Sequence, residues 1–243
     1  MSAQQTNRSL TQQQLMDGYG KAVSNGLRLL EASIDLTGEF PDVALGLAEI
    51  GQEEIGKSLS ILAAFSLARN QWSWFWSAWK DHQLKAHRAF LYELISPLRL
   101  EIRTADGVRS LGPPLRQKIT HEKEFSFYVN FDPQLGQFVS PANAVAAIET
   151  HNRAATLLYL AVIAWHVRAA LDEENPSFRH KAFSEIAFRI CSERIDQQDM
   201  PEIFAEFESR SESHKQLMTA IRTRLAEGKD FLTSSLKRAQ SGD

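Results

Sequence analysis

Residues 48–65 read AEIGQEEIGKSLSILAAF, a strongly helical and mostly apolar stretch with Glu53, Glu54 and Lys57 at its centre. An unpaired charge inside a core is costly, so in a core helix these groups must face water or be paired. Elsewhere along the chain the prolines fall between helical patterns and not inside them, which is typical of an all-α protein. The sequence therefore predicts an all-α fold in which the direction of these charged side chains decides the chemistry.

Length and composition indicate a globular protein. The 243 residues are 43% hydrophobic, enough for one large core or two small ones. The single cysteine, Cys191, excludes an intramolecular disulfide, and the polar beginning MSAQQTNRSLTQQQ has no apolar signal core, so we expect a reducing cytoplasmic location. The apolar stretch 154–170 is short for a membrane span and contains His166 and Arg168, so we interpret it as a buried helix and predict no membrane segment.

The net charge gives no general reason to bind nucleic acid. It is −3 overall, with a pI near 6.2, but it is unevenly distributed. Residues 172–212 hold eleven acidic and five basic side chains, whereas residues 214–238 hold six basic and two acidic ones. We interpret both runs as solvated helix faces.

Helical periodicity and breaker residues predict six helices, within residues 11–37, 41–69, 72–99, 141–171, 177–194 and 201–237. We expect Pro97 to bend or end the third of them. Residues 104–116 combine Asp-Gly with Gly-Pro-Pro and predict a turn or linker. The alternation in FSFYVNFD (125–132) predicts one short extended segment, either a lone strand or a stretch packed on the helices.

The direction of the charges in the second helix follows from 100° per residue. Glu54 falls in one apolar stripe, and Lys57 lies at i+3, where it can meet it. Glu53 lies further round, and we predict that this side faces water together with two neighbouring polar residues, Glu49 and Ser60. The apolar stripe that contains Glu54 is made by Val43, Leu47, Ile50, Ile61 and Phe65.

The third predicted helix repeats this pattern. His82 falls inside its apolar arc, and Lys85 flanks the arc one turn later. We therefore predict that these two residues meet Glu54 and Lys57 in one polar cluster between the second and third helices. The cluster is either a functional site with shifted pKa values or a structural network that fixes helix register.

Several other kinds of site lack their sequence signature. A di-iron site in a helical bundle needs Glu-x-x-His pairs, and the chain has none. There is also no P-loop, no dinucleotide fingerprint and no Gly-x-Ser-x-Gly turn. We predict no metal and no cofactor. The tryptophan-rich WSWFWSAW (72–79) is at helical spacing, so we interpret it as core in preference to a base-stacking platform.

The order of four motifs resembles the abortive-infection AbiV family of the HEPN superfamily. These motifs are NGLRLLEA (25–32), EEIGK (53–57), KDHQLK (80–85) after the tryptophan-rich segment, and FYVNFD (127–132) before PANA (141–144). The resemblance covers about residues 15–172. It implies an all-α HEPN-like bundle at 11–172. Outside the resemblance we expect a flexible tail at 1–10, a C-terminal helical extension packed on the core at 173–238 and a flexible end at 239–243.

The resemblance also implies a function. Many HEPN proteins are metal-independent ribonucleases that act as dimers in prokaryotic conflict systems, so it implies phage defence in a bacterial cytoplasm. The implied partners are RNA, a phage-encoded activator protein and a second copy of the chain. The alternative function is a non-enzymatic module that senses or sequesters a phage or host protein.

Two sets of site residues follow from the resemblance. Its motif positions are Glu53, Glu54, Gly56, Lys57, His82 and Lys85. In the first set His82 is the acid–base group, Lys57 and Lys85 contact phosphate and Glu54 orients them. The second set is the pair Arg116 and His121, whose spacing matches the Arg-x(4–6)-His pattern of HEPN ribonucleases.

Overall fold

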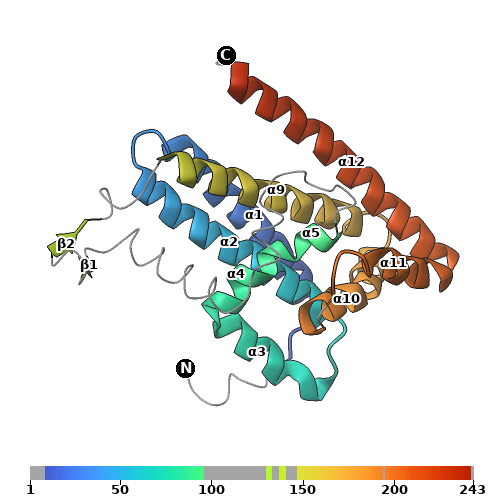
Figure 1. Cartoon of the computed structure of the whole chain (residues 1–243). Coiled ribbons are helices and arrows are strands. Elements are labelled where there is room, and N and C mark those ends of the chain that lie inside the picture. Colours follow the sequence, from blue (N-terminus) through green and yellow to red (C-terminus); the bar gives the residue numbers. More distant parts are fainter. Residues whose placement is uncertain (1–8, 96–129, 133–136, 141–146, 194, 242–243) are drawn as a thin grey trace.

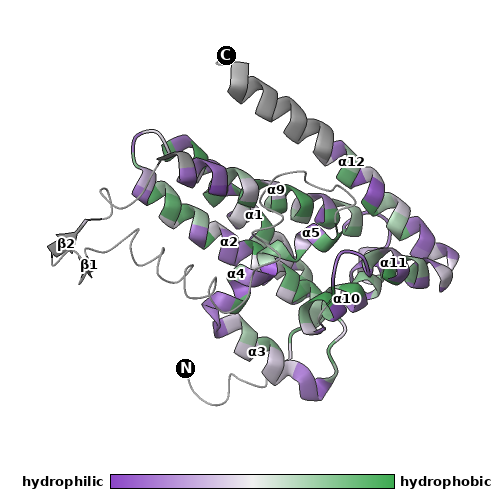
Figure 2. Cartoon of the chain, viewed as in Figure 1, coloured by the Kyte–Doolittle hydropathy of each residue, from purple (hydrophilic) through white to green (hydrophobic). Residues whose placement is uncertain are grey.

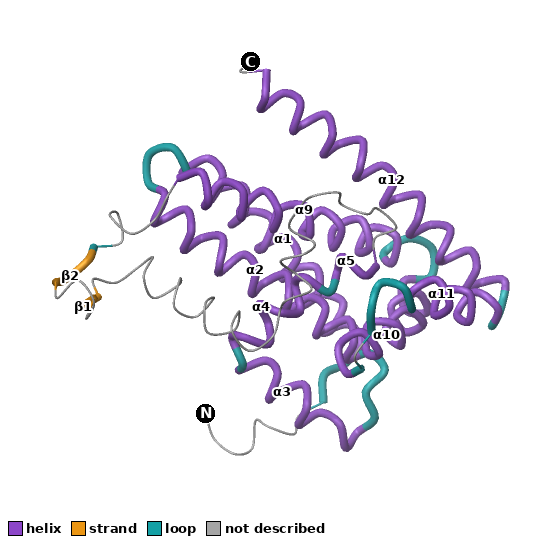
Figure 3. The backbone as a smooth tube through the Cα atoms, viewed as in Figure 1, coloured by secondary structure: helices purple, strands orange, loops and turns teal. Residues whose placement is uncertain are grey.

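The computed structural model describes residues 9–95, 130–132, 137–140, 147–193 and 195–241, and these residues form an all-α bundle, as predicted (Figures 1 and 3). The first helices are α1 (Gln12–Leu36), α2 (Pro41–Ala64), the short 3₁₀ helix η2 (Arg69–Gln71), α3 (Trp72–Lys80), α4 (His82–Phe90) and α5 (Tyr92–Ile95). The later ones are α9 (Ala147–Leu171), α10 (Pro176–Ser192), α11 (Met200–Ser209) and α12 (Glu212–Ser241).

Local signals set the beginnings of the first two helices. The Thr11 side chain accepts a hydrogen bond from the Gln14 backbone N–H, and the Gln14 side chain accepts one from the Thr11 backbone N–H. Proline at the first position opens α2, where its missing N–H has no cost. The predicted second helix is five residues too long, because α2 ends at Ala64.

The predicted third helix is wrong as a single element. Asp81 has extended backbone angles, φ −84° and ψ 104°, and its carboxylate accepts a hydrogen bond from the Leu84 N–H at 2.9 Å. It therefore ends α3 and caps a new helix, α4. The predicted last helix is also divided, between Ser209 and Glu212. Pro97 and the predicted linker 104–116 lie outside the described residues.

The extended segment has a partner that the sequence analysis did not identify. Strand β1 (Asn130–Asp132) pairs antiparallel with β2 (Gln137–Val139), with Phe131 opposite Phe138. The pair lies apart from the helices in Figure 1. The predicted short extended segment is confirmed for residues 130–132, but it is neither a lone strand nor packed on the helices, and residues 125–129 lie outside the described part of the chain.

The centre of the bundle is α2. It contacts α1, α4, α9 and α10, and 17 of its 24 residues are buried. A Cβ added at Gly26 of α1 would lie 2.5 Å from the Ile55 Cδ1, so this glycine lets α1 and α2 approach closely. Figure 2 shows many apolar residues along α2 and α9 and more polar ones along α12.

Helix α9 is the other apolar element of the centre. By length and composition alone, residues Glu149–Leu171 are able to cross a membrane. The core helix of a bundle meets the same criteria, and α9 packs along α1, α2 and α12 with 61% of its most apolar stretch buried. The packing agrees with a core helix, as predicted for 154–170.

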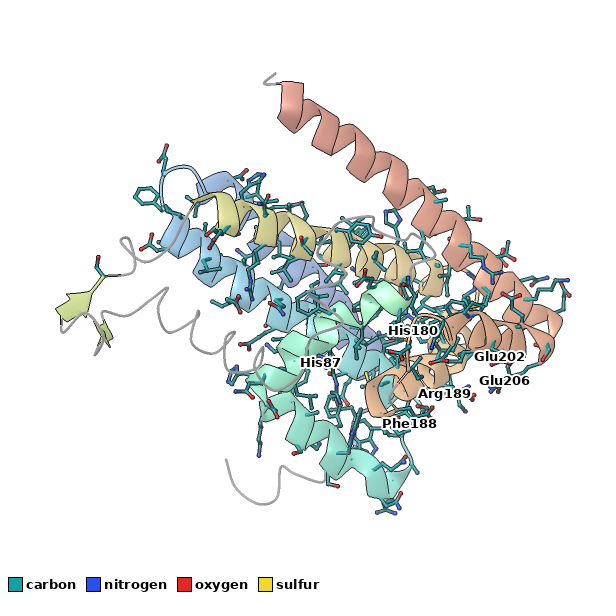
Figure 4. The ribbon with its side chains drawn as sticks, viewed as in Figure 1. His87, His180, Phe188, Arg189, Glu202 and Glu206 are labelled. Carbon is teal, nitrogen blue, oxygen red and sulfur yellow. The ribbon has the colours of Figure 1, made fainter. Side chains whose placement is uncertain are left out.

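The C-terminal helices add to the same apolar cluster and carry ion pairs on their outer sides. Met200, Phe207 and Leu217 belong to the cluster formed by α1, α2 and α9. Arg189 of α10 donates to Glu206 of α11 at 3.0 Å, and Figure 4 shows these two side chains on neighbouring helices. Exposed pairs of this kind contribute little to stability, because solvent screens them.

A buried histidine connects the end of α9 to α10. His180 is fully buried between the rings of Tyr19 and Phe65, and its Nε2 lies 2.9 Å from a carboxylate oxygen of Asp172. Partial burial raises the pKa of Asp172, but the hydrogen bond and charge of His180, with the charge of Arg168, outweigh it and lower the pKa. Ionised Asp172 is thus favoured in the folded chain.

Because the folded pKa of Asp172 is lowered, its stabilisation is present above the unfolded value of about 3.9 and is lost as pH falls through the folded value. We expect Asp172→Asn to lower the free energy of unfolding at pH 7, and the difference from wild type to shrink below about pH 4. Urea unfolding across this pH range measures both. A difference that stays constant with pH would contradict the assignment.

Candidate functional site

The site begins with a close contact between α2 and α4. A Cβ added at Gly56 would lie 1.6 Å from the Lys85 carbonyl oxygen and 3.2 Å from the Ala89 nitrogen. The Gln52 amide, one turn earlier, donates to the Ala86 carbonyl at 2.8 Å. The two backbones touch here, and only glycine leaves the space for this contact.

This contact covers Glu53, which lies three residues before Gly56 on the same side of α2. Glu53 is only 7% exposed. Its Oε2 lies 2.7 Å from the His82 Nδ1 and 3.5 Å from the Lys85 Nζ. The His82 side chain is 67% exposed, whereas that of Lys85 is buried. A buried carboxylate therefore lies between an exposed imidazole and a buried ammonium group.

The side of α2 that we predicted to face water is buried. Glu53, Glu49 and Ser60 are all covered, because α4 and α9 pack over them. Glu49 pairs with Arg153 of α9, and the Ser60 hydroxyl accepts a hydrogen bond from Arg88 of α4 at 2.8 Å. Conversely Val43, predicted to face inward, is exposed.

Glu54 and Lys57 form the predicted i+3 ion pair, but apart from His82. Both side chains are mostly buried, and the Lys57 ammonium lies 5.6 Å from the centre of the Trp79 ring. In the described residues the hydrogen bond of Glu54 goes to Lys57. The predicted single cluster is thus two neighbouring groups: Glu53 with His82 and Lys85, and Glu54 with Lys57 and Trp79.

The first group has the geometry of an acid–base pair. A carboxylate beside Nδ1 holds the imidazole in one orientation and favours the tautomer with the proton on that nitrogen. Nε2 has no hydrogen bond in the described part of the chain, and the ring is exposed. The arrangement can therefore accept or donate a proton at Nε2 toward a molecule outside the protein.

Two further predictions concern metals and the second pair. The part of the chain that the structure describes holds no cluster of three histidine, cysteine or carboxylate side chains that could bind a metal ion. Arg116 and His121 lie outside the described residues. The structure brings together four residues of the first set as two pairs, His82 with Lys85 and Glu54 with Lys57.

Sequence reasoning missed Glu53 as the residue that contacts His82. One signal for it was present. Gly56 lies in the interior of α2 and does not cap it. A glycine at such a position often marks the close approach of another backbone, as Lys85 approaches here. Glu53 shares that face, so the glycine marks its side of α2 as a packed one.

Comparison with protein families gives a match over much of the chain. The family model HEPN_AbiV, described as AbiV, matches residues 14–159, more than half of the chain. The matched range includes nearly all of α1 and the whole of α2 to α5, and with them Glu53, His82 and Lys85. Neither the curated proteins nor the solved structures gave a match.

Proposed function

The chain belongs to the AbiV family of HEPN proteins, and from this membership we propose that it acts in abortive infection as a metal-independent endoribonuclease in the bacterial cytoplasm. The observation that supports the activity is the exposed imidazole of His82 on the buried carboxylate of Glu53, 2.7 Å apart. Cleavage of RNA needed for translation would stop phage growth together with the infected cell.

The proposed reaction is transfer of the phosphodiester to the neighbouring 2′-hydroxyl. His82 Nε2 takes the proton of that hydroxyl, the 2′-oxygen forms a bond to phosphorus, and the bond to the 5′-oxygen breaks. The imidazolium then returns the proton to the leaving 5′-oxygen. The products are a 2′,3′-cyclic phosphate and a free 5′-hydroxyl, so protons and electrons balance.

The other residues have positions that suit different roles. Lys57, which pairs with Glu54 and is 20% exposed, supplies positive charge to the phosphate in this proposal as negative charge develops there. Lys85 is buried, so in this proposal it is a positioning residue that holds the Glu53 carboxylate in place. Glu53 takes the orienting role that the sequence analysis gave to Glu54.

We expect His82→Ala to reduce cleavage of total RNA and tRNA by at least about 100-fold in the absence of metal, because positioned acid–base groups contribute roughly 10² to 10⁴ in rate. Gel analysis in the presence of a chelator measures this. The side chain is exposed, so the variant should keep the helicity of the wild type.

The matched control is His121→Ala, which should cleave at the wild-type rate. Loss of cleavage in His121→Ala alone would move the active pair to Arg116 and His121. An inactive wild type would contradict the ribonuclease proposal and favour the alternative, a non-enzymatic module that binds a phage or host protein.

A further inference from the structure

A second polar surface lies where α1 meets α9. It is an open groove of about 410 Å³, lined mainly by α1 and by Arg168 of α9. Three cations and one carboxylate line it, with two neutral hydrogen-bonding side chains and a glycine. The lining includes Asp17, Gly20, Lys21, Ser24, Asn25, Arg28 and Arg168. None of these residues contacts Glu53 or His82 in the described structure, so the groove is separate from the site above.

Arg168 is held in the groove by three contacts. Its Nε donates to Asp172 at 3.2 Å, its Nη1 donates to the Ser24 hydroxyl at 3.3 Å, and its guanidinium lies 5.3 Å from the centre of the Trp165 ring. A Cβ added at Gly20 would lie 2.8 Å from the Arg168 Nη2. The glycine therefore lets the guanidinium lie across α1, and Nη2 has no partner in the described residues.

The remaining cations are available to a ligand. Arg28 donates to the Asn25 side chain on its own helix at 2.9 Å and has no carboxylate partner among the described residues. Lys21 pairs with Asp17, but both side chains are more than half exposed, so the pair is weak. Asn25 and Arg28 belong to the NGLRLLEA motif, which the Glu53 site does not use.

Trp165 does not line the groove itself, but its ring contacts Arg168, which does. Its side chain is 42% exposed, one of the few large apolar side chains on the described surface, and it stacks on Arg168. A cationic groove beside an exposed aromatic ring is how proteins bind single-stranded nucleic acid, with phosphates on the cations and a base on the ring. An acidic peptide would use the cations but not the ring.

We propose that the α1–α9 groove binds the backbone of single-stranded RNA, with Arg28 and Arg168 on phosphates and Trp165 stacked on a base. The choice of RNA over other polyanions rests on the proposed function. The groove holds the substrate at a second place, away from His82, and so raises affinity without taking part in the reaction.

The test is equilibrium binding of a 2′-O-methyl oligouridine of about twelve nucleotides, which fills a typical single-strand site. This probe has no free 2′-hydroxyl, so the proposed reaction cannot cleave it. We expect the double variant Arg28→Gln/Arg168→Gln to bind roughly tenfold or more weakly. The slope of log binding constant against log salt concentration should become less steep by about 1.4, because each phosphate contact on a single strand contributes about 0.7. Trp165→Leu should weaken binding by about tenfold. The slope of log binding constant against log salt concentration should stay as in the wild type, because the ring carries no charge.

Controls separate the groove from general effects. Arg69→Gln removes one exposed cation on η2, outside the groove, and should bind as the wild type does. Arg28→Gln alone loses no contact beyond its own helix, so it should fold normally and bind more weakly. Equal binding by wild type and both Arg28 variants would overturn the proposal, as would equal competition by polyglutamate, which would indicate an acidic protein partner.

The outcome does not depend on cleavage. His82→Ala should keep wild-type affinity for the probe. If the groove variants bind the probe more weakly but the wild type cleaves no RNA, the proposed function is overturned and the groove proposal stands. If cleavage is lost in His82→Ala but the groove variants bind the probe as the wild type does, the proposed function stands and the groove proposal is overturned.

Discussion

Gly56→Ala should lower the free energy of unfolding by about 3 kcal/mol, the upper part of the range for overpacked sites. The added Cβ would lie 1.6 Å from the Lys85 carbonyl oxygen, a backbone atom that cannot rotate away as a side chain can. Helix α4 must then move off α2. Intrinsic preference acts in the opposite direction, because alanine stabilises a helix by about 1 kcal/mol relative to glycine. Urea unfolding measures the difference.

The matched control is Gly38→Ala, in the turn between α1 and α2, where an added Cβ has no neighbour within 4 Å. We expect a change within about 0.5 kcal/mol of wild type, or a slight gain in stability. A stabilised Gly56→Ala variant would mean that α4 does not lie on α2 at this residue. The same displacement should separate His82 from Glu53, so Gly56→Ala should also lose RNA cleavage.

Glu53→Ala is the second large expected effect. The change removes the carboxylate that faces both the His82 imidazole and the buried Lys85 ammonium. Taking one partner out of a buried ion pair costs about 3 to 5 kcal/mol, because the other charge stays in a poorly solvated place. Urea unfolding should show a loss near the lower end, since His82 is exposed to water.

Glu54→Ala is its control, because Glu54 is the neighbouring carboxylate and pairs with Lys57 nearer the surface. We expect a smaller loss than for Glu53→Ala, because the Lys57 side chain is 20% exposed whereas that of Lys85 is 5% exposed. Glu53→Gln, which keeps the shape of the side chain, should retain the fold and reduce cleavage. If Glu53 acts through His82, the double variant Glu53→Gln/His82→Ala should cleave no more slowly than His82→Ala. Additive losses would show that the two residues act separately.

Local sequence signals predict the starts of α1 and α2, but the sequence analysis missed the break between α3 and α4 at Asp81. Thr11 with Gln14, and Pro41 at the first position of α2, are local signals, and α1 and α2 begin within one residue of the predicted starts. Asp81 is as local a signal, since it caps α4 through its own carboxylate. It was missed because the residues on both sides have helical periodicity, and the apolar arc of Trp72–Phe90 continues in phase across the break.

The site shows the same division more sharply. The i+3 pair of Glu54 and Lys57 depends only on helix geometry, so the sequence determined it. The sequence predicts His82 inside the apolar arc and Lys85 at its flank, whereas in the structure Lys85 is buried and His82 is exposed. The partner of His82 was a different matter, because Glu53 and Glu54 are adjacent and only a neighbouring helix distinguishes them.

The sequence by itself determined an all-α chain, the starts of α1, α2, α3, α10 and α11 to within one residue, and the set of residues from which a site can be made. Only the tertiary structure decided which charged side chains of α2 are buried. Since α1, α4, α9 and α10 surround this helix and 17 of its 24 residues are buried, hydrophobic periodicity finds no single apolar face. The close contact of Gly56 with Lys85 sets where α4 lies, and so it places Glu53, and not Glu54, beneath His82.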